Sequence, residues 1–286
     1  MVLILLALGN TFAQKIDSSN VNKKRIIGLS ITYVTCYAGA IVGFNELWYK
    51  NSEQTKFHWF DDSKEWNQID KFGHAYSAFH ESRVFTQTYK WAGLSSKKAA
   101  LYGGLTAFLY QTPIEILDGY SAKWGASKSD LLANTIGALL SSSQFYFFND
   151  YPIQFKYSFF KSKFSKERPD VLGANYTERF LKDYNGQSYW LSTSISTFNK
   201  KWKKYDYLGV CVGYGSEEMI FANKTQNKQI GLNHYRQFYL GPDIQFSKIP
   251  TNNKFLHSLL FLLDMYKFPF PALEYNKQNK FSIGFY

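Results

Sequence analysis

Carboxylate and imidazole side chains gather between residues 70 and 140, in segments that otherwise consist of small and apolar residues. His74, Glu81 and Asp118 are the candidates for catalysis, because a histidine beside carboxylates can transfer protons as an acid and a base. Five more polar residues are candidates for binding: Asp70, Lys71, Glu115, Asp130 and Asn134. Polar groups on apolar helices need partners, since burying an unpaired polar group costs free energy.

Some of these residues also fit the pattern of a helix start. Thr112 can be an N-cap, Pro113 then occupies the first helical position, and Glu115 reaches back to complete a capping box. Ser127 and Asp130 repeat the pattern before the next apolar run. We therefore expect a helix to begin at each of these two places, which would give the two carboxylates a structural role.

His74 is the residue that such local roles leave unexplained, followed by Glu81 and Asp118. Asp70 at a helix start suits the helix dipole, and Asn134 can hydrogen-bond to a neighbouring helix in an apolar setting. No HExxH or CxxC motif is present, and we expect no metal and no other cofactor. A buried histidine–carboxylate pair and a functional site both remain open.

Apolar and small residues predict helices over the segments that carry or precede these side chains: 25–49, 68–91, 95–111, 113–118 and 128–148. Gly103 and Gly104 would weaken the third helix, so we expect another helix to approach its backbone closely there. The first segment is long enough to span a bilayer, with basic residues before it and aromatic residues near its end. A buried core helix is the alternative.

The second half of the chain changes character after Pro152. Alternating and aromatic runs predict strands over 188–198, 207–214, 235–246 and 280–286, with a helix over 255–266. The fold class is therefore α+β, in which a membrane-associated core of about five helices is followed by a small antiparallel β-rich part. The expected domains are a signal peptide (1–14), a helical core (25–150) and a β-rich region (151–286).

Composition points to the cell envelope. The apolar run VLILLAL before Ala13 and Gln14 is typical of a signal peptide. Aromatic residues make up 19% of the chain and the net charge is +11, which together suit an anionic lipid surface. The lysines are scattered rather than interleaved with aromatics, so we expect no nucleic-acid partner. Membrane lipid is the expected partner, with envelope proteins as further candidates.

Several motifs carry a family resemblance over about residues 66–142. They are DKFGHAYSA, the E-x-x-D of Glu115 and Asp118, and S-x-x-D-x-x-x-N-x-x-G from Ser127 to Gly137. This combination resembles the YfiM-like predicted periplasmic lipoproteins, a family of unknown function. FHWFDDSKEWNQ, RPDVLG and LKDYNGQSYWLS resemble its longer Gram-negative version.

The resemblance implies the envelope of a Gram-negative bacterium, in the periplasm or at the outer membrane. This chain departs from the family in having no cysteine at the expected cleavage point, where a lipid would be attached. The order DK-x-x-H, E, D-x-x-x-N-x-x-G is also similar to VanZ-like membrane proteins, an analogy that hints at a role near cell wall or lipid.

Two functions follow as hypotheses. The first is a structural or binding protein of the envelope, in which buried polar contacts hold helices together. The alternative is a membrane-proximal hydrolase acting on lipid or cell-wall precursors, which requires His74 and the nearby carboxylates to converge in one pocket. Whether the chain is an enzyme at all is left open by the sequence.

Overall fold

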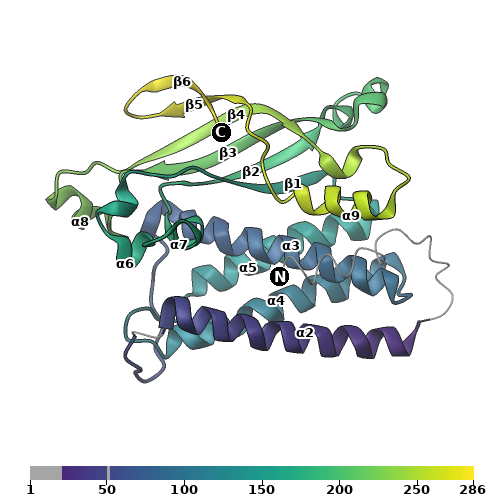
Figure 1. Ribbon diagram of the computed structural model, residues 1–286, viewed down its shortest axis with the longest axis horizontal. Helices are drawn as coiled ribbons and strands as arrows, with labels where there is room; N and C mark the ends of the chain where they lie inside the picture. Colours follow the sequence, from purple (N-terminus) through teal and green to yellow (C-terminus); the bar gives the residue numbers. More distant parts are fainter. Residues whose placement is uncertain (1–20, 50–51) are drawn as a thin grey trace. The chain divides into compact units, whose positions relative to one another are not determined.

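The computed structural model describes residues 21–49 and 52–286, and the chain forms two compact units (Figure 1). The helical unit comprises Met1–Asp62, Ser77–Tyr151 and Thr251–Leu259, and the sheet unit comprises Ser63–Tyr76, Pro152–Pro250 and Leu260–Tyr286. The class is α+β, as predicted. The expected signal peptide, residues 1–14, lies outside the described residues.

Four long helices account for most of the first half of the chain: α2 (Lys23–Phe44), α3 (Ile69–Trp91), α4 (Ser96–Gly119) and α5 (Lys128–Phe148). A π-helical turn, η1 (Asn45–Tyr49), continues α2. The short 3-10 turn η2 (Glu65–Gln68) precedes α3, which begins in the sheet unit and continues into the helical unit. Helices α3 and α5 therefore lie where the periodicity of small and apolar residues predicts them.

The predicted helix start at Thr112 is wrong. Helix α4 runs through Pro113 without a break, from Ser96 to Gly119. Instead of capping a helix, the Thr112 hydroxyl donates a hydrogen bond to the carbonyl of Phe108, 2.8 Å away and one turn earlier. The Glu115 side chain accepts the backbone N–H of Ser127 rather than that of Thr112. A tertiary contact thus decides the role of Glu115, and the local pattern was misleading.

The close helix approach expected at Gly103 and Gly104 is confirmed. A Cβ atom added at Gly103 would collide with the Thr86 hydroxyl and would lie 2.8 Å from the Thr86 backbone nitrogen on α3. One added at Gly104 would lie 2.8 Å from the Cβ of Ser142 on α5. Both glycines are buried, so α4 contacts two neighbouring helices through its backbone.

The sheet unit contains one antiparallel sheet in which the strands follow one another in chain order (Figure 1). The strands are β1 (Ile153–Phe159), β2 (Gln187–Ser194), β3 (Leu208–Glu217), β4 (Tyr235–Ile244), β5 (Pro271–Asn276) and β6 (Lys280–Phe285). The sequence did not predict β1 and β5. The segment of β1 carries a charged lysine between aromatic residues, and β5 begins at Pro271, which indicated only the end of a helix.

Short helices and turns connect these strands and complete the chain. They are α6 (Pro169–Leu172), α7 (Tyr176–Lys182), α8 (Lys224–Gln229), α9 (Lys254–Leu263), and the 3-10 turns η3 (Phe164–Lys166), η4 (Ile195–Thr197), η5 (Lys200–Tyr205) and η6 (Phe246–Lys248). Helix α9 corresponds to the helix predicted over 255–266.

The two faces of the sheet differ in chemistry. One face is buried, and it presents Trp190, Cys211 and Tyr239 beside serine, glutamine and charged side chains. The other face is apolar, and most of its side chains on β3 to β6 are exposed. Phe72 lies in the part of α3 that belongs to the sheet unit, and its ring stacks on Tyr214 with 4.7 Å between the ring centroids. A half-solvated antiparallel sheet usually shows the opposite distribution.

The glycine contacts give a paired prediction. We expect Gly103→Ala to lower the free energy of unfolding by about 1–3 kcal/mol, because the new methyl group meets the α3 backbone. Gly39→Ala on α2 meets nothing within 4 Å and should raise helix stability by about 0.5–1 kcal/mol. Denaturant unfolding of the two full-length variants measures both effects. Equal stability of the two variants would contradict the packing described here.

Candidate functional site

A cluster of acids and serines surrounds the start of α5 in the helical unit. Ser127 is the N-cap, as predicted, and its Oγ accepts the backbone N–H of Asp130 at 3.1 Å. Its own N–H donates to Glu115 Oε2 at 3.1 Å. Asp62 Oδ1 accepts the hydroxyls of Ser127 and Ser129 at 2.6 and 2.7 Å. Ser127 therefore links α4, α5 and the segment before α3.

This arrangement differs from the capping box that the sequence predicts. In such a box Asp130 would receive the Ser127 N–H, whereas here Glu115 receives it. Glu115 and Asp130 are only 3% and 5% exposed. Sequence reasoning missed Asp62 as a member of the cluster, because its two serine partners are far away along the chain and no local pattern connects them.

The other two carboxylates of the predicted site also contact neighbouring segments within the helical unit. Gln111 Nε2 on α4 donates to Glu81 Oε1 on α3 at 2.7 Å. The Tyr49 hydroxyl in η1 donates to Asp118 Oδ1 at 2.7 Å. Each of these hydrogen bonds joins two helices. Both carboxylates thus contribute to the association of helices.

Asp70, Lys71 and His74 lie on the part of α3 that belongs to the sheet unit. Lys71 Nζ lies 2.8 Å from Asp70 Oδ2, and the Tyr184 hydroxyl donates to Asp70 Oδ1 at 3.2 Å. His74 is half-buried. Asn134, in contrast, lies on α5 in the helical unit and is fully buried. The candidate residues are therefore divided between the two units.

Sequence reasoning missed a group of buried charges in the sheet unit. Lys156 Nζ on β1 lies 2.8 Å from Asp243 Oδ2 on β4 and 3.3 Å from Asp264 Oδ1. Lys267 Nζ lies 3.9 Å from Asp243 Oδ1. The Ser192 hydroxyl on β2 donates to Asp243 Oδ2 at 2.5 Å. All four charged side chains are completely buried, and burial lowers the pKa of Lys267 below its ordinary value.

These charges hold the sheet to the segment that follows α9. Asp264 accepts the backbone N–H groups of Phe246 and Ser247 at 2.6 and 2.9 Å, in addition to its contact with Lys156. Lys267 donates to the carbonyl of Phe268 at 2.7 Å. Two lysines and two aspartates balance in charge, and the hydrogen bonds satisfy much of their remaining polarity. These contacts therefore have a structural role, because they fix the segment after α9 to the sheet.

Comparison with known proteins identifies a family for one part of the chain. Residues 57–146 match a family described as "Predicted periplasmic lipoprotein (DUF2279)". This confirms the resemblance found in the motifs between residues 66 and 142, and it supports a location in the Gram-negative cell envelope. No curated protein and no solved structure matches the chain.

The serine cluster yields a test of its structural role. Ser127→Ala removes the N-cap of α5 and a hydrogen bond to Asp62, so we expect a loss of about 1–2 kcal/mol in unfolding free energy. Ser129→Ala is the matched control, because it removes a hydrogen bond to Asp62 but no cap. Denaturant unfolding of both variants is the measurement. A smaller loss for Ser127→Ala than for Ser129→Ala would contradict this role.

Proposed function

We propose that this protein, which matches the predicted periplasmic lipoprotein family over residues 57–146, is a membrane-embedded envelope protein with a structural or binding role. Its helical unit lies in lipid, and its buried polar side chains hold the helices together. The observation that carries the proposal is the distribution of side chains on α4 and α5, where small and polar residues fill most buried positions and many large apolar residues are exposed.

Helix α4 illustrates this distribution. Its buried positions are small or polar and include Gly103, Gly104, Ala107, Gln111 and Glu115. Its large apolar side chains lie on the outside: Leu101, Leu105, Leu109 and Ile116 are 61%, 54%, 56% and 47% exposed. A soluble protein rarely exposes such a continuous apolar surface, because water contact with it is unfavourable.

Helix α5 has the same character. Asn134 and Ser141 are completely buried, while Leu132, Ile136 and Leu139 are 59%, 53% and 59% exposed. In lipid this distribution is favourable, since apolar side chains meet acyl chains and polar side chains find partners on neighbouring helices. The exposed apolar side chains of α5 therefore continue the type of surface that α4 presents.

The lengths of the helices suit a bilayer. Helices α2, α4 and α5 have 22, 24 and 21 residues, which corresponds to roughly 33, 36 and 32 Å at 1.5 Å per residue. The hydrocarbon core of a bilayer is about 30 Å thick. Among the described residues, α2 is the one helix that is both long and apolar enough to cross a membrane by composition, and only 6% of its apolar window is buried.

Basic and aromatic side chains gather at both ends of the helical unit, as they do at the two edges of a membrane segment. One end holds the starts of α2 and α4, with a hydrogen bond from Asn22 N to the carbonyl of Ala92, and it carries Lys23, Lys24, Arg25, Lys97 and Lys98. The other end exposes four aromatic side chains: Phe57, Trp59, Phe60 and Tyr120. Basic and aromatic residues are both typical of membrane–water interfaces.

The contacts of the carboxylates favour this role over the hydrolase alternative. Glu81 accepts a hydrogen bond from Gln111, Glu115 from Ser127 and Asp118 from Tyr49. A hydrolase would need these carboxylates to face a common substrate. Bonds that connect one helix to another are what a structural role requires.

Thiol labelling tests the lipid location directly. In a background carrying Cys36→Ala and Cys211→Ala, we expect Leu105→Cys and Ile136→Cys to react at least about tenfold more slowly with a charged maleimide than Lys123→Cys does. The reason is that hydrocarbon excludes the reagent and disfavours the thiolate. Open membrane fragments containing the full-length protein are used, and full denaturation of the protein in sodium dodecyl sulfate and urea should then restore reactivity. Rapid labelling at Leu105 in intact membrane would refute the proposal.

A further inference from the structure

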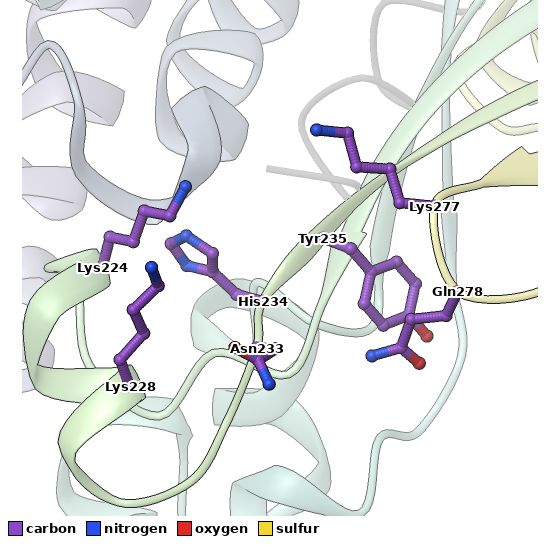
Figure 2. A pocket seen from close by; sticks show the side chains of 7 residues that line it. All are labelled: Lys224, Lys228, Asn233, His234, Tyr235, Lys277 and Gln278. Atoms are coloured by element: carbon purple, nitrogen blue, oxygen red, sulfur yellow. The ribbon is translucent and has the colours of Figure 1, made fainter.

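A cavity of about 240 Å³ in the sheet unit gathers basic side chains from two segments (Figure 2). Lys224 and Lys228 on α8 and His234 before β4 form one side, and Lys277 and Gln278 in the β5–β6 turn form the other. Among the described residues, no acidic side chain lines this cavity. Such a concentration of positive charge favours an anionic ligand.

Two glutamates that do not line the cavity accept hydrogen bonds from residues that do. Glu218 Oε2 accepts the backbone N–H of Asn233 at 3.3 Å and the Gln278 side-chain amide at 3.1 Å. The Tyr235 hydroxyl donates to Glu217 Oε2 at 2.6 Å. These hydrogen bonds connect the segment before β4 to the β5–β6 turn and to the end of β3. The cavity is thus braced from several sides.

His234 provides an unused polar atom at this place. Its Nδ1 atom is buried and has no hydrogen-bond partner among the described residues. Burial lowers the pKa of His234, and the charges of Lys224, Arg236 and Lys228 lower it further. The ring therefore lies in a positive potential, which an anion would relieve by binding beside it.

The apolar face of the sheet, opposite to the face on which the cavity-lining Tyr235 lies, shows an ordered change in side-chain character along the strands. Directly beside the β5–β6 turn, Phe238, Tyr275 and Phe281 are paired across β4, β5 and β6 and are 49%, 45% and 67% exposed. The next row on the same face is aliphatic, and its members Leu240, Leu273 and Ile283 are 55%, 39% and 77% exposed. Basic, aromatic and aliphatic groups thus follow one another away from the cavity.

Chemical groups follow the same order with increasing depth in a lipid leaflet. Phosphate groups lie outermost, the interface that aromatic rings favour comes next, and acyl chains follow. We propose that the lysine cavity binds the phosphate of a lipid headgroup while the aliphatic row of β4 to β6 contacts the acyl chains. The inference goes beyond the proposed function, because it concerns the sheet unit and names a ligand.

The test compares two triple variants of the full-length protein in phosphatidylcholine nanodiscs. The site variant carries Lys224→Gln, Lys228→Gln and Lys277→Gln. The control variant carries Lys200→Gln, Lys201→Gln and Lys204→Gln, which remove the same charge from η5, at the opposite end of the sheet. Calorimetry follows titration with dihexanoyl phosphatidic acid, with inorganic phosphate and with a short single-stranded oligonucleotide, after subtraction of the heat from empty nanodiscs.

We expect the site variant to bind phosphatidic acid about 100-fold more weakly than the wild type, since each lysine contributes roughly a factor of five. The control variant should change by less than about twofold. Equal losses in both variants, or no binding by the wild type, would overturn the inference. Inorganic phosphate binding as tightly as phosphatidic acid would overturn the inference in favour of a free phosphate, and an oligonucleotide that binds as tightly would overturn it in favour of a general polyanion site.

The experiment distinguishes a failure of this inference from a failure of the proposed function. If the protein enters nanodiscs but does not bind phosphatidic acid, the headgroup site is wrong and the lipid location of the helical unit stands. If the protein does not enter nanodiscs, that lipid location is wrong, and the same titrations in detergent-free buffer still decide whether the lysine cavity binds phosphate.

Discussion

The hydrogen bond from Ser127 N–H to Glu115 shows the constraint on which the helical unit depends. Its interior contains polar and even charged side chains, and such groups remain buried at acceptable cost only when they bond to one another. These contacts and small residues occupy much of the space between the helices, beside a few large side chains such as Phe79 and Phe85, and many other large apolar side chains lie outside. The lipid proposal follows from the exposed apolar side chains of α4 and α5, which an apolar surrounding would cover, while hydrogen bonds and close backbone packing help to hold the interior together.

The sheet unit also buries polar groups and exposes apolar ones. Its buried face contains the charges of Lys156 and Asp243, completely enclosed, whereas the exposed rows on its other face are aromatic and aliphatic. A sheet that stood in water would gain by the reverse arrangement. The same preference for an apolar environment thus occurs in both units, and in the sheet unit the apolar rows end near the group of lysines that lines the cavity.

The sequence was most informative where structure is determined locally. Small and apolar periodicity located α3 and α5, Ser127 was recognised as an N-cap, and Gly103 indicated close backbone packing. Local reasoning failed at Thr112, where Pro113 imitates a helix start although packing carries α4 through it. Strand β5 was missed for a similar reason, since its first residue is a proline at the point where it enters the sheet.

The candidate site could be predicted only in part, because its contacts join residues distant in the chain. Glu115 was predicted to complete a capping box with Thr112, but it accepts the N–H of Ser127, the N-cap of another helix. The Lys156–Asp243 pair joins β1 to β4, and neither residue stands out in a linear pattern. Exposure is likewise a tertiary property: alternation in β6 predicts two faces but not which of them another element covers.

The central claim is that the outer surface of the helical unit contacts acyl chains. Collision rates of a nitroxide attached at Leu139→Cys, in the full-length protein reconstituted into bilayers, test it most directly. We predict that dissolved oxygen, which concentrates in hydrocarbon, will collide with this label more often than a water-soluble nickel chelate, with the reverse order for a label at Lys201→Cys on the exposed η5 turn. A label at Leu139 that meets the nickel chelate as readily as the one at Lys201 would contradict the account.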